Sequence, residues 1–401
     1  MQSIKELYKI GRGPSSSHTL APERACRLFI AQFGKADHYE AELFGSLSLT
    51  GKGHHTDQVI IDTLPSKTTV IFSLDWKESF PNGFYLRSYD ADNSLLHKWT
   101  VFSIGGGSIE IKEFPTNYND EVYKETSFEE IHDLCRKEGI SLLDYIYGYE
   151  PDLPEYLSTI LDAMVDCVER GLHTEGRIPS ELEMYRSAHQ LYEEAVETRG
   201  RERDDLFRMA YAYAASEENA AGHTCITAPT LGACGVMTAF MYDCVESHLY
   251  MRDQLINALA IGGLFGNLIK TNATISGAVG GCQAEVGTAV SMTAAAYSYL
   301  LGGNIDQNEY AAEIAMEHHL GLTCDPVKGY VMIPCIERNA MGILRAIDAA
   351  VLSQYMSRIR RHSISFDMVV RTMNETGQQL PRQLKETAEG GLAKEYEAEE
   401  Q

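Results

Sequence analysis

The chain has 401 residues, with 34 Lys and Arg against 57 Asp and Glu, which gives a formal net charge of −23. Its composition, 44% hydrophobic and 23% charged, is that of an ordinary globular protein and excludes disordered and fibrous classes. So large a negative charge repels phosphate backbones and anionic lipid. We therefore expect neither a nucleic acid nor a membrane surface as a partner.

The first part of the chain mixes short alternating runs with glycine turns, up to about residue 115. Alternation of this kind predicts strands, here at residues 39–49, 68–74, 84–89 and 99–104. An amphipathic helix is expected before them, at residues 22–33. This part is therefore of the α/β or α+β class.

Helical periodicity dominates from about residue 127 onward. The predicted helices are residues 128–139, 156–171, 180–198, 206–216, 258–269, 283–301, 309–320 and 336–356. Polar residues at 113–125 and two prolines within 148–154 indicate a boundary. The sequence thus predicts a small α/β (or α+β) domain over residues 1–125, a linker over 126–150 and a larger, mostly α-helical domain over 151–401.

The longest apolar stretch, residues 258–269, is shorter than the roughly 20 residues that cross a bilayer. The opening segment MQSIKELYKIGRG has no apolar core of the kind found in signal peptides, so we expect a cytoplasmic protein. Nine cysteines without a C-x-x-C pair do not indicate a disulfide framework. In a reducing compartment they are packing residues, nucleophiles or metal ligands.

Three cysteines occupy similar local settings. Cys282 and Cys335 each open a predicted helix, where the helix dipole stabilises a thiolate, and Cys324 follows a helix and precedes Asp325. Three thiolates suit a soft metal or an iron–sulfur cluster, and a cubane held by three cysteines leaves one iron free to act as a Lewis acid. The alternative is three free thiols buried in apolar helices. The other six fall mostly on apolar helical faces and are expected to be packing residues: Cys26, Cys135, Cys167, Cys225, Cys234 and Cys244.

Two polar loops of the first part could reach a ligand. GPSSSHT, at residues 13–19, places three hydroxyls and the His18 imidazole just before a helix, where hydroxyls and backbone N–H groups can hold a carboxylate. TGKGHHTD, at residues 50–57, supplies Lys52, His54 and His55. The alternatives are an ordinary helix N-cap for the first loop and a solvated turn for the second.

Polar islands interrupt the helical part at SEENAAG, KTNATISGA and IERNAMG. Their polar side chains would be costly to bury alone, so they either pair with one another or face a substrate. Both interpretations stay open for Glu218, Asn219, Asn272, Arg338 and Asn339.

Nine strings along the chain can be compared with known families as an ordered set. They are GPSSSHT, GSLSLTGKGHHTD, SIGGG, EENAAG, TAPTLGACG, SGAVGGCQAEVG, AMEHHLGLTCDPVKG, PCIERNAMG and KETAEGGLA. Between Ile10 and Ala393 the chain closely resembles the iron–sulfur-dependent L-serine dehydratases of bacteria, in their single-chain form with fused β and α domains. The resemblance implies a [4Fe-4S] cluster on Cys282, Cys324 and Cys335, and no pyridoxal phosphate.

The activity implied by the resemblance is that of an L-serine ammonia-lyase, which converts L-serine to pyruvate and ammonia. The base that removes the Cα proton is then expected to be His18, His54 or Lys52, with the histidines favoured by their ordinary pKa. Substrate binding is expected from the serine-rich loop and the polar islands: Ser15, Ser16, Ser17, Thr19, Asn272, Arg338 and Asn339.

Other functions stay open at this point. The same cluster could serve a cysteine desulfidase or a threonine dehydratase, and a non-catalytic amino-acid sensor could use it to detect oxygen. We expect a small-molecule substrate and a homodimer. The segment between Asp57 and Pro81 is shorter than in typical single-chain relatives, which puts in doubt any dimer contact or regulation built there.

Overall fold

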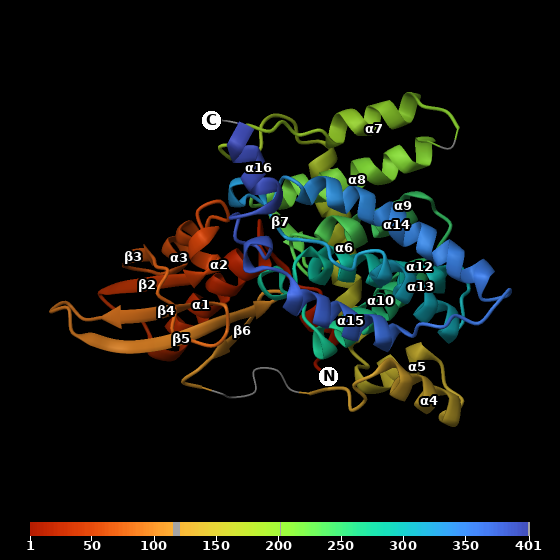
Figure 1. Ribbon diagram of the computed structural model, residues 1–401, viewed down its shortest axis with the longest axis horizontal. Helices are drawn as coiled ribbons and strands as arrows, with labels where there is room; N and C mark the ends of the chain where they lie inside the picture. Colours follow the sequence, from red (N-terminus) through yellow and green to blue (C-terminus); the bar gives the residue numbers. More distant parts are fainter. Residues whose placement is uncertain (115–120, 201, 400–401) are drawn as a thin grey trace.

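The computed structural model describes residues 1–114, 121–200 and 202–399, so residues 115–120 of the predicted boundary lie outside the described residues. Two bodies lie side by side: a five-stranded sheet with helices α1 to α3, here called the sheet domain, and a larger helical domain of α4 to α16 (Figure 1). This confirms the predicted fold class. None of the described helices combines the length and apolar character that a membrane crossing requires.

The sheet domain is ordered β3-β2-β4-β5-β6, with β2 and β3 parallel and the other neighbours antiparallel. Its elements are α1 (Ala21–Phe33), β2 (His38–Gly45), α2 (Ser46–Leu49), α3 (Thr56–Thr63), β3 (Lys67–Phe72), β4 (Asn82–Tyr89), β5 (Leu95–Gly105) and β6 (Ser108–Ile111). The buried rings of Phe29 on α1 and Trp99 on β5 meet edge to face, 5.0 Å between centroids. Helix α1 therefore covers one face of the sheet.

All four predicted strands form, but the first is shorter than expected. Strand β2 ends at Gly45, which has a φ of 60°, and the chain turns there into α2. Only glycine adopts this conformation without strain, and a Cβ at this position would lie 1.9 Å from the Pro81 carbonyl oxygen. The predicted strand over residues 39–49 is therefore wrong in its last four residues, which become the helical turn that carries Ser46.

The helical domain packs around α12, most of whose side chains are buried among α9, α10, α13 and α14. Its elements are α4 (Phe128–Glu138), α5 (Leu142–Tyr149), α6 (Leu153–Leu172), α7 (Ala188–Glu197), α8 (Glu202–Ala220), α9 (Cys234–Glu246), α10 (Arg252–Asn272), α11 (Gly277–Gly280), α12 (Thr288–Leu300), α13 (Ile305–Glu317), α14 (Cys335–Met356), α15 (Phe366–Gln379) and α16 (Gly391–Glu399). Gly262 on α10 permits the close contact with α12, since a Cβ there would lie 2.8 Å from the Met292 carbonyl oxygen.

One predicted helix begins later than its pattern indicated. The structure has α7 at Ala188–Glu197, whereas the prediction began at residue 180. The Glu217 carboxylate accepts the backbone N–H groups of Ser187 and Ala188, which fixes the start of the helix there. For the other predicted helices, most of the observed ends lie within a few residues of the predicted ends.

The two domains are joined by more than the chain between them. Ile4, Leu7 and Tyr8, around the short 3-10 helix η1 (Ile4–Glu6), are buried in the core of the helical domain. Strand β1 (Ile10–Arg12) then pairs antiparallel with β7 (Thr224–Ile226) of the helical domain. The chain returns from β1 to the sheet domain through residues 13–19, which are therefore held at the junction of the two domains.

Candidate active site between the two domains

A small buried cavity lies where residues 13–19 meet the helical domain. Residues from both domains line it: Ser15, His54, Gly232, Cys282, Glu285, Val286, Cys324, Pro326, Val331, Cys335 and Glu386. The three cysteines singled out from the sequence thus share one cavity with one of the two expected histidines. The remaining six cysteines are buried elsewhere in the two cores, as predicted.

Two of the three thiols come from helix starts and one comes from a loop. Cys282 precedes the π-helical turn η3 (Gln283–Gly287), Cys324 follows α13, and Cys335 is the first residue of α14. The sulfurs of Cys282 and Cys324 and a carboxylate oxygen of Glu285 lie within 4.8 Å of one another. The thiols therefore converge although they are far apart in the sequence.

The donor set fits a thiophilic metal centre. A hydrogen bond with Cys282 and burial raise the pKa of the Cys324 thiol, and burial raises the pKa of Cys335. To become thiolates in so dry a place, the three cysteines would require a compensating cation, which a metal centre supplies. Gly277 leaves room beside them, because a Cβ there would lie 2.5 Å from Glu285 Oε2 and 3.4 Å from Cys324 Sγ.

Arg338 and Asn339 lie beside the thiols and support them. The Arg338 guanidinium donates to the Thr323 carbonyl oxygen at 2.6 Å and to Asp325 Oδ1 at 3.3 Å, so it braces the turn that carries Cys324. The Asn339 amide donates to the carbonyl oxygens of Gly232 and Cys335, both at 2.8 Å. Neither side chain lines the cavity.

Asn272 and Lys52 are not brought to the cavity. The Asn272 amide is at the exposed end of α10 and donates to the carbonyl oxygens of Thr126 and Leu268. The Lys52 side chain is 73% exposed, pairs with Asp57 and lies over the Phe72 ring. These two expected site residues thus stand apart from the others in the structure.

The hydroxyls of the serine-rich loop divide into two sets. Ser16 Oγ accepts the Leu231 N–H at 2.7 Å, and Thr19 Oγ1 accepts the Ser15 N–H at 2.9 Å, so both are used to hold the loop. Ser15 Oγ lines the cavity and lies 3.3 Å from Ser17 Oγ. Ser15 is thus the residue of this loop that lines the cavity, and its hydroxyl also accepts the His18 N–H at 3.2 Å.

His18 is fully buried, and hydroxyls surround its ring. Its Nε2 lies 3.0 Å from both Ser46 Oγ and Thr50 Oγ1, and these hydroxyls already donate to the carbonyl oxygens of Glu386 and Ser46. Nε2 must therefore carry the proton and donate. Nδ1 then accepts from Ser17 Oγ at 2.8 Å, so both ring nitrogens of His18 have partners.

One ring nitrogen of His54 keeps a free lone pair. Its Nδ1 lies 2.8 Å from the Thr50 carbonyl oxygen, which can only accept, so Nδ1 carries the proton and Nε2 has the free lone pair. Burial lowers the pKa of His54 to about 4, which keeps the ring neutral at pH 7. The His18 and His54 rings are stacked, 4.2 Å between centroids. Of the two histidines, His54 is the one that presents an unprotonated nitrogen near the cavity.

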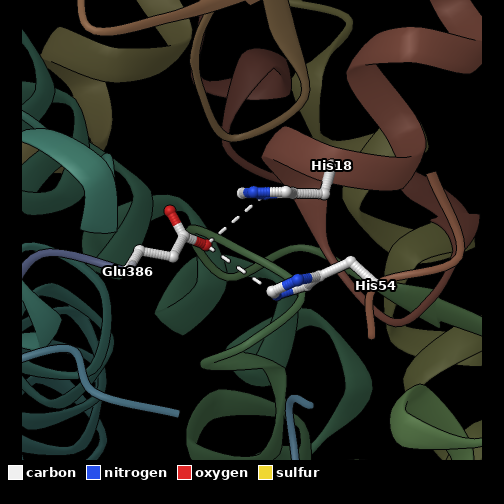
Figure 2. A group of neighbouring side chains, drawn as sticks. All are labelled: His18, His54 and Glu386. Atoms are coloured by element: carbon white, nitrogen blue, oxygen red, sulfur yellow. Dashed lines mark ion pairs between the residues drawn. The ribbon is translucent and has the colours of Figure 1, made fainter. Parts of the chain in front are cut away.

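The sequence interpretation did not assign a role to Glu386, which Figure 2 shows facing both histidines. Its Oε1 lies 3.5 Å from His18 Nδ1 and 4.0 Å from His54 Nε2, and its Oε2 has no partner among the described residues. Burial raises the pKa of this carboxyl well above its ordinary value, with further contributions from Glu285 and Cys282. Its string KETAEGGLA pointed to this segment through the resemblance, but no local pattern placed it near the histidines.

The backbone of Glu386 explains how it is held. Its φ of 58° lies in the left-handed region, which costs about 1–2 kcal/mol for a residue with a Cβ. Its N–H donates to the Cys324 carbonyl oxygen at 2.7 Å, and its own carbonyl oxygen accepts from Ser46 Oγ at 2.7 Å. Glu386 is thus held between the turn that carries a thiol and the helical turn α2 of the sheet domain.

The chain is similar to known proteins over nearly its whole length. Residues 3–69 match the family model of the serine dehydratase beta chain, and residues 67–393 match that of the serine dehydratase alpha chain. The chain is 37% identical to L-serine dehydratase TdcG of Escherichia coli (strain K12), over 98% of this chain and 99% of the relative. It is 35% identical to L-serine dehydratases of Haemophilus influenzae and Streptomyces coelicolor, over 98% of this chain and 99% and 98% of those relatives. The chain therefore belongs to the serine dehydratase family, with the regions that correspond to the beta and alpha chains fused in one polypeptide.

Proposed function

We propose that this chain is a lyase that converts L-serine to pyruvate and ammonia with a [4Fe-4S] cluster held by Cys282, Cys324 and Cys335. The observation that carries the proposal is the convergence of three thiols and the unprotonated His54 Nε2 on one buried cavity. The names of the similar proteins, all L-serine dehydratases, support the choice of substrate.

When bound, the cluster supplies a Lewis acid at the iron that has no protein ligand. The chain's own contribution begins with His54, whose Nε2 takes the proton from Cα as general base. The electron pair left at Cα forms the Cα–Cβ double bond as the Cβ–O bond breaks, and the departing hydroxide takes the proton from the His54 imidazolium and is released as water. The resulting aminoacrylate tautomerises to an imine, which water hydrolyses to pyruvate and ammonia.

Two neighbours prepare His54 for this step. The Thr50 carbonyl oxygen fixes the Nδ1–H tautomer, so that Nε2 is the basic nitrogen. Glu386 Oε1, 4.0 Å from Nε2, faces the imidazolium that forms when the proton is taken. We assign substrate carboxylate binding to the hydroxyl of Ser15, a residue that lines the cavity, because the Ser17 hydroxyl donates its one proton to His18 Nδ1.

Anaerobic purification with iron and sulfide counting, combined with a pyruvate assay, tests the proposal. We expect about four irons and four sulfides per chain, as in a cubane cluster, and loss of activity in air. Pyruvate should form from L-serine faster than 2-oxobutyrate forms from L-threonine or pyruvate from L-cysteine. A faster reaction with either competitor would favour the threonine dehydratase or cysteine desulfidase alternative, and the absence of any turnover would favour the sensor.

Single Cys→Ser variants test the ligand set. Replacement of Cys282, Cys324 or Cys335 should remove most of the iron, because three ligands are the fewest that hold a cubane with one open iron. Cys26→Ser, in the buried core of the sheet domain, is the matched control and should keep the iron. Full iron content in two of the three ligand variants would overturn the assignment.

A further inference from the structure

A second cleft, of about 720 Å³, opens at the junction of the two domains and shares no lining residue with the candidate active site. Strand β1 and the first turns of α1 form much of it, and Tyr156 of α6 also lines it. Its charged lining residues are Glu6, Lys9, Arg12, Glu23, Arg24 and Arg27. Four cations against two carboxylates give the lining residues an excess of two positive charges, of which Arg12 shares one with Asp62 at 3.6 Å, in a chain whose net charge is −23.

The carboxylate of Glu6 is shared among several cations at the base of this cleft. Its Oε2 lies 2.9 Å from Lys9 Nζ and 3.7 Å from an Arg24 nitrogen. Lys270, at the end of α10, is a third cation whose charge interacts with this group. One carboxylate therefore serves three cations.

Lys270 shows that the positive charge at the base of the cleft is not balanced. Its ammonium nitrogen is buried and has no hydrogen-bond partner among the described residues. Burial, followed by the charge of Lys9, lowers the pKa of Lys270 to about 7, although Glu6 acts in the opposite direction. A buried ammonium without an acceptor is costly, and it is stabilised when a negative charge is brought nearby.

Arg24 has unused donors at the wall of the same cleft. Its guanidinium makes the single long ion pair with Glu6, and within the described residues no hydrogen bond to it is found. A guanidinium carries five N–H donors in a planar fork, which matches the oxygens of a carboxylate or a phosphoryl group. Arg24 is therefore placed to receive an oxyanion from the cleft.

We propose that this cleft binds a small dianion, carrying either a phosphoryl group or two carboxylates, on Arg24 with Lys9 and Lys270 behind it. Lys9 Nζ already donates to the Gly106 carbonyl oxygen at 3.1 Å and to Ser108 Oγ at 3.0 Å, so Lys9 contributes its charge and not a hydrogen bond. Two negative charges neutralise the excess of the lining residues, and the volume is within the range of small-molecule sites. L-serine does not satisfy this site, since its zwitterion has no net charge. The ligand is thus distinct from the substrate proposed above, and the inference does not depend on that proposal.

Isothermal titration calorimetry on the anaerobically purified protein tests the site, with inorganic phosphate in one arm and succinate in the other. Sodium chloride keeps the ionic strength constant and excludes a general salt effect. We expect one dianion per chain, and the tighter of the two arms identifies the chemistry of the natural ligand. His54→Ala should bind the dianion as the wild type does, because the candidate active site is separate.

Arg24→Gln should weaken dianion binding at least tenfold. Arg345→Gln is the matched control, since Arg345 is an exposed arginine on α14 that pairs with Asp348, and it should bind as the wild type does. Equal binding by these two variants, or no binding of either dianion above the chloride background, would overturn the proposal. A change of oligomeric state in Arg24→Gln, measured by light scattering, would assign the cleft to a protein partner instead.

Lys270→Met supplies an independent test with a variant that is expected to fold. Methionine removes the buried charge, so without added anion this variant should unfold at a higher temperature than the wild type. Phosphate should raise the unfolding temperature of the wild type by more than that of the variant. An equal phosphate effect in both proteins would contradict the place given to Lys270.

Discussion

At the level of single residues, the two stacked histidines differ in what their nitrogens can do. His18 donates to two hydroxyls and accepts from a third, so its ring holds together residues of the loop 13–19 and the turn α2. His54 donates only to the Thr50 carbonyl oxygen and keeps Nε2 free. Burial, the neighbouring ring and the hydrogen bonds thus favour a structural part for His18, and the proton transfer that we propose falls to His54.

His54→Ala should lose at least about a hundredfold in kcat, the usual scale for a general base, and should keep its iron. His18→Ala should lower the unfolding temperature, because it leaves the buried hydroxyls of Ser17, Ser46 and Thr50 without their ring partner. The pyruvate assay, iron analysis and thermal unfolding of both variants check these outcomes. Wild-type turnover in His54→Ala would remove it from the reaction.

At the level of elements, the segment between α15 and α16 and the first turn of α16 hold the turn that carries Cys324. The Leu384 carbonyl oxygen accepts the Cys324 N–H at 2.9 Å, and the Leu392 N–H donates to Asp325 Oδ2 at 2.9 Å. Asp325 also accepts from Arg338, so the turn with Cys324 is fixed from both sides. The position of one thiol therefore depends on elements far from it in the sequence.

Gly277→Ala tests how closely α11 approaches the thiols. A Cβ there would meet Glu285 and Cys324 at the distances given above, so we expect less iron per chain and a proportional loss of activity. Gly148→Ala is the control, because a Cβ at that position of α5 meets no atom within 4 Å. There the alanine should leave the iron unchanged and stabilise the helix by about 0.5–1 kcal/mol. Equal iron in both variants would show that the contact at Gly277 is easily relieved.

At the level of the whole molecule, local pattern predicted the fold class, most of the longer helices, the position of Cys282 and Cys335 at helix starts and that of Cys324 after α13. It did not predict that Ile4, Leu7 and Tyr8 lie in the core of the helical domain, because periodicity does not indicate which distant segment covers a residue. Glu386 and Lys52 show the same limit for the site. Glu386 is brought to the site by backbone hydrogen bonds to Cys324 and Ser46, whereas Lys52 pairs with Asp57 at the surface.

Buried carboxyls in a chain of net charge −23 also determine how the stability of the whole fold depends on pH. Glu313 on α13 is 2% exposed, and burial, with the charges of Glu317 and Glu309, raises its pKa to about 8. In the unfolded chain this carboxyl titrates near 4.5. Between these two pH values the folded protein holds a proton that the unfolded chain has released, so the free energy of unfolding falls as the pH rises through this window.

Glu313→Gln removes this dependence, since an amide does not ionise. The variant and the wild type should unfold at nearly the same temperature at pH 5, and the variant should unfold at a higher temperature by several degrees at pH 9, where the wild type carries the buried charge. Glu181→Gln, at an exposed glutamate, removes the same formal charge and is the matched control for the net charge of the chain. If both variants gain equally at pH 9, overall repulsion rather than the buried carboxyl sets the pH dependence. If the unfolding temperature at pH 9 rises in Glu313→Gln alone, the cause is the burial of that carboxyl next to the acidic side chains of α13.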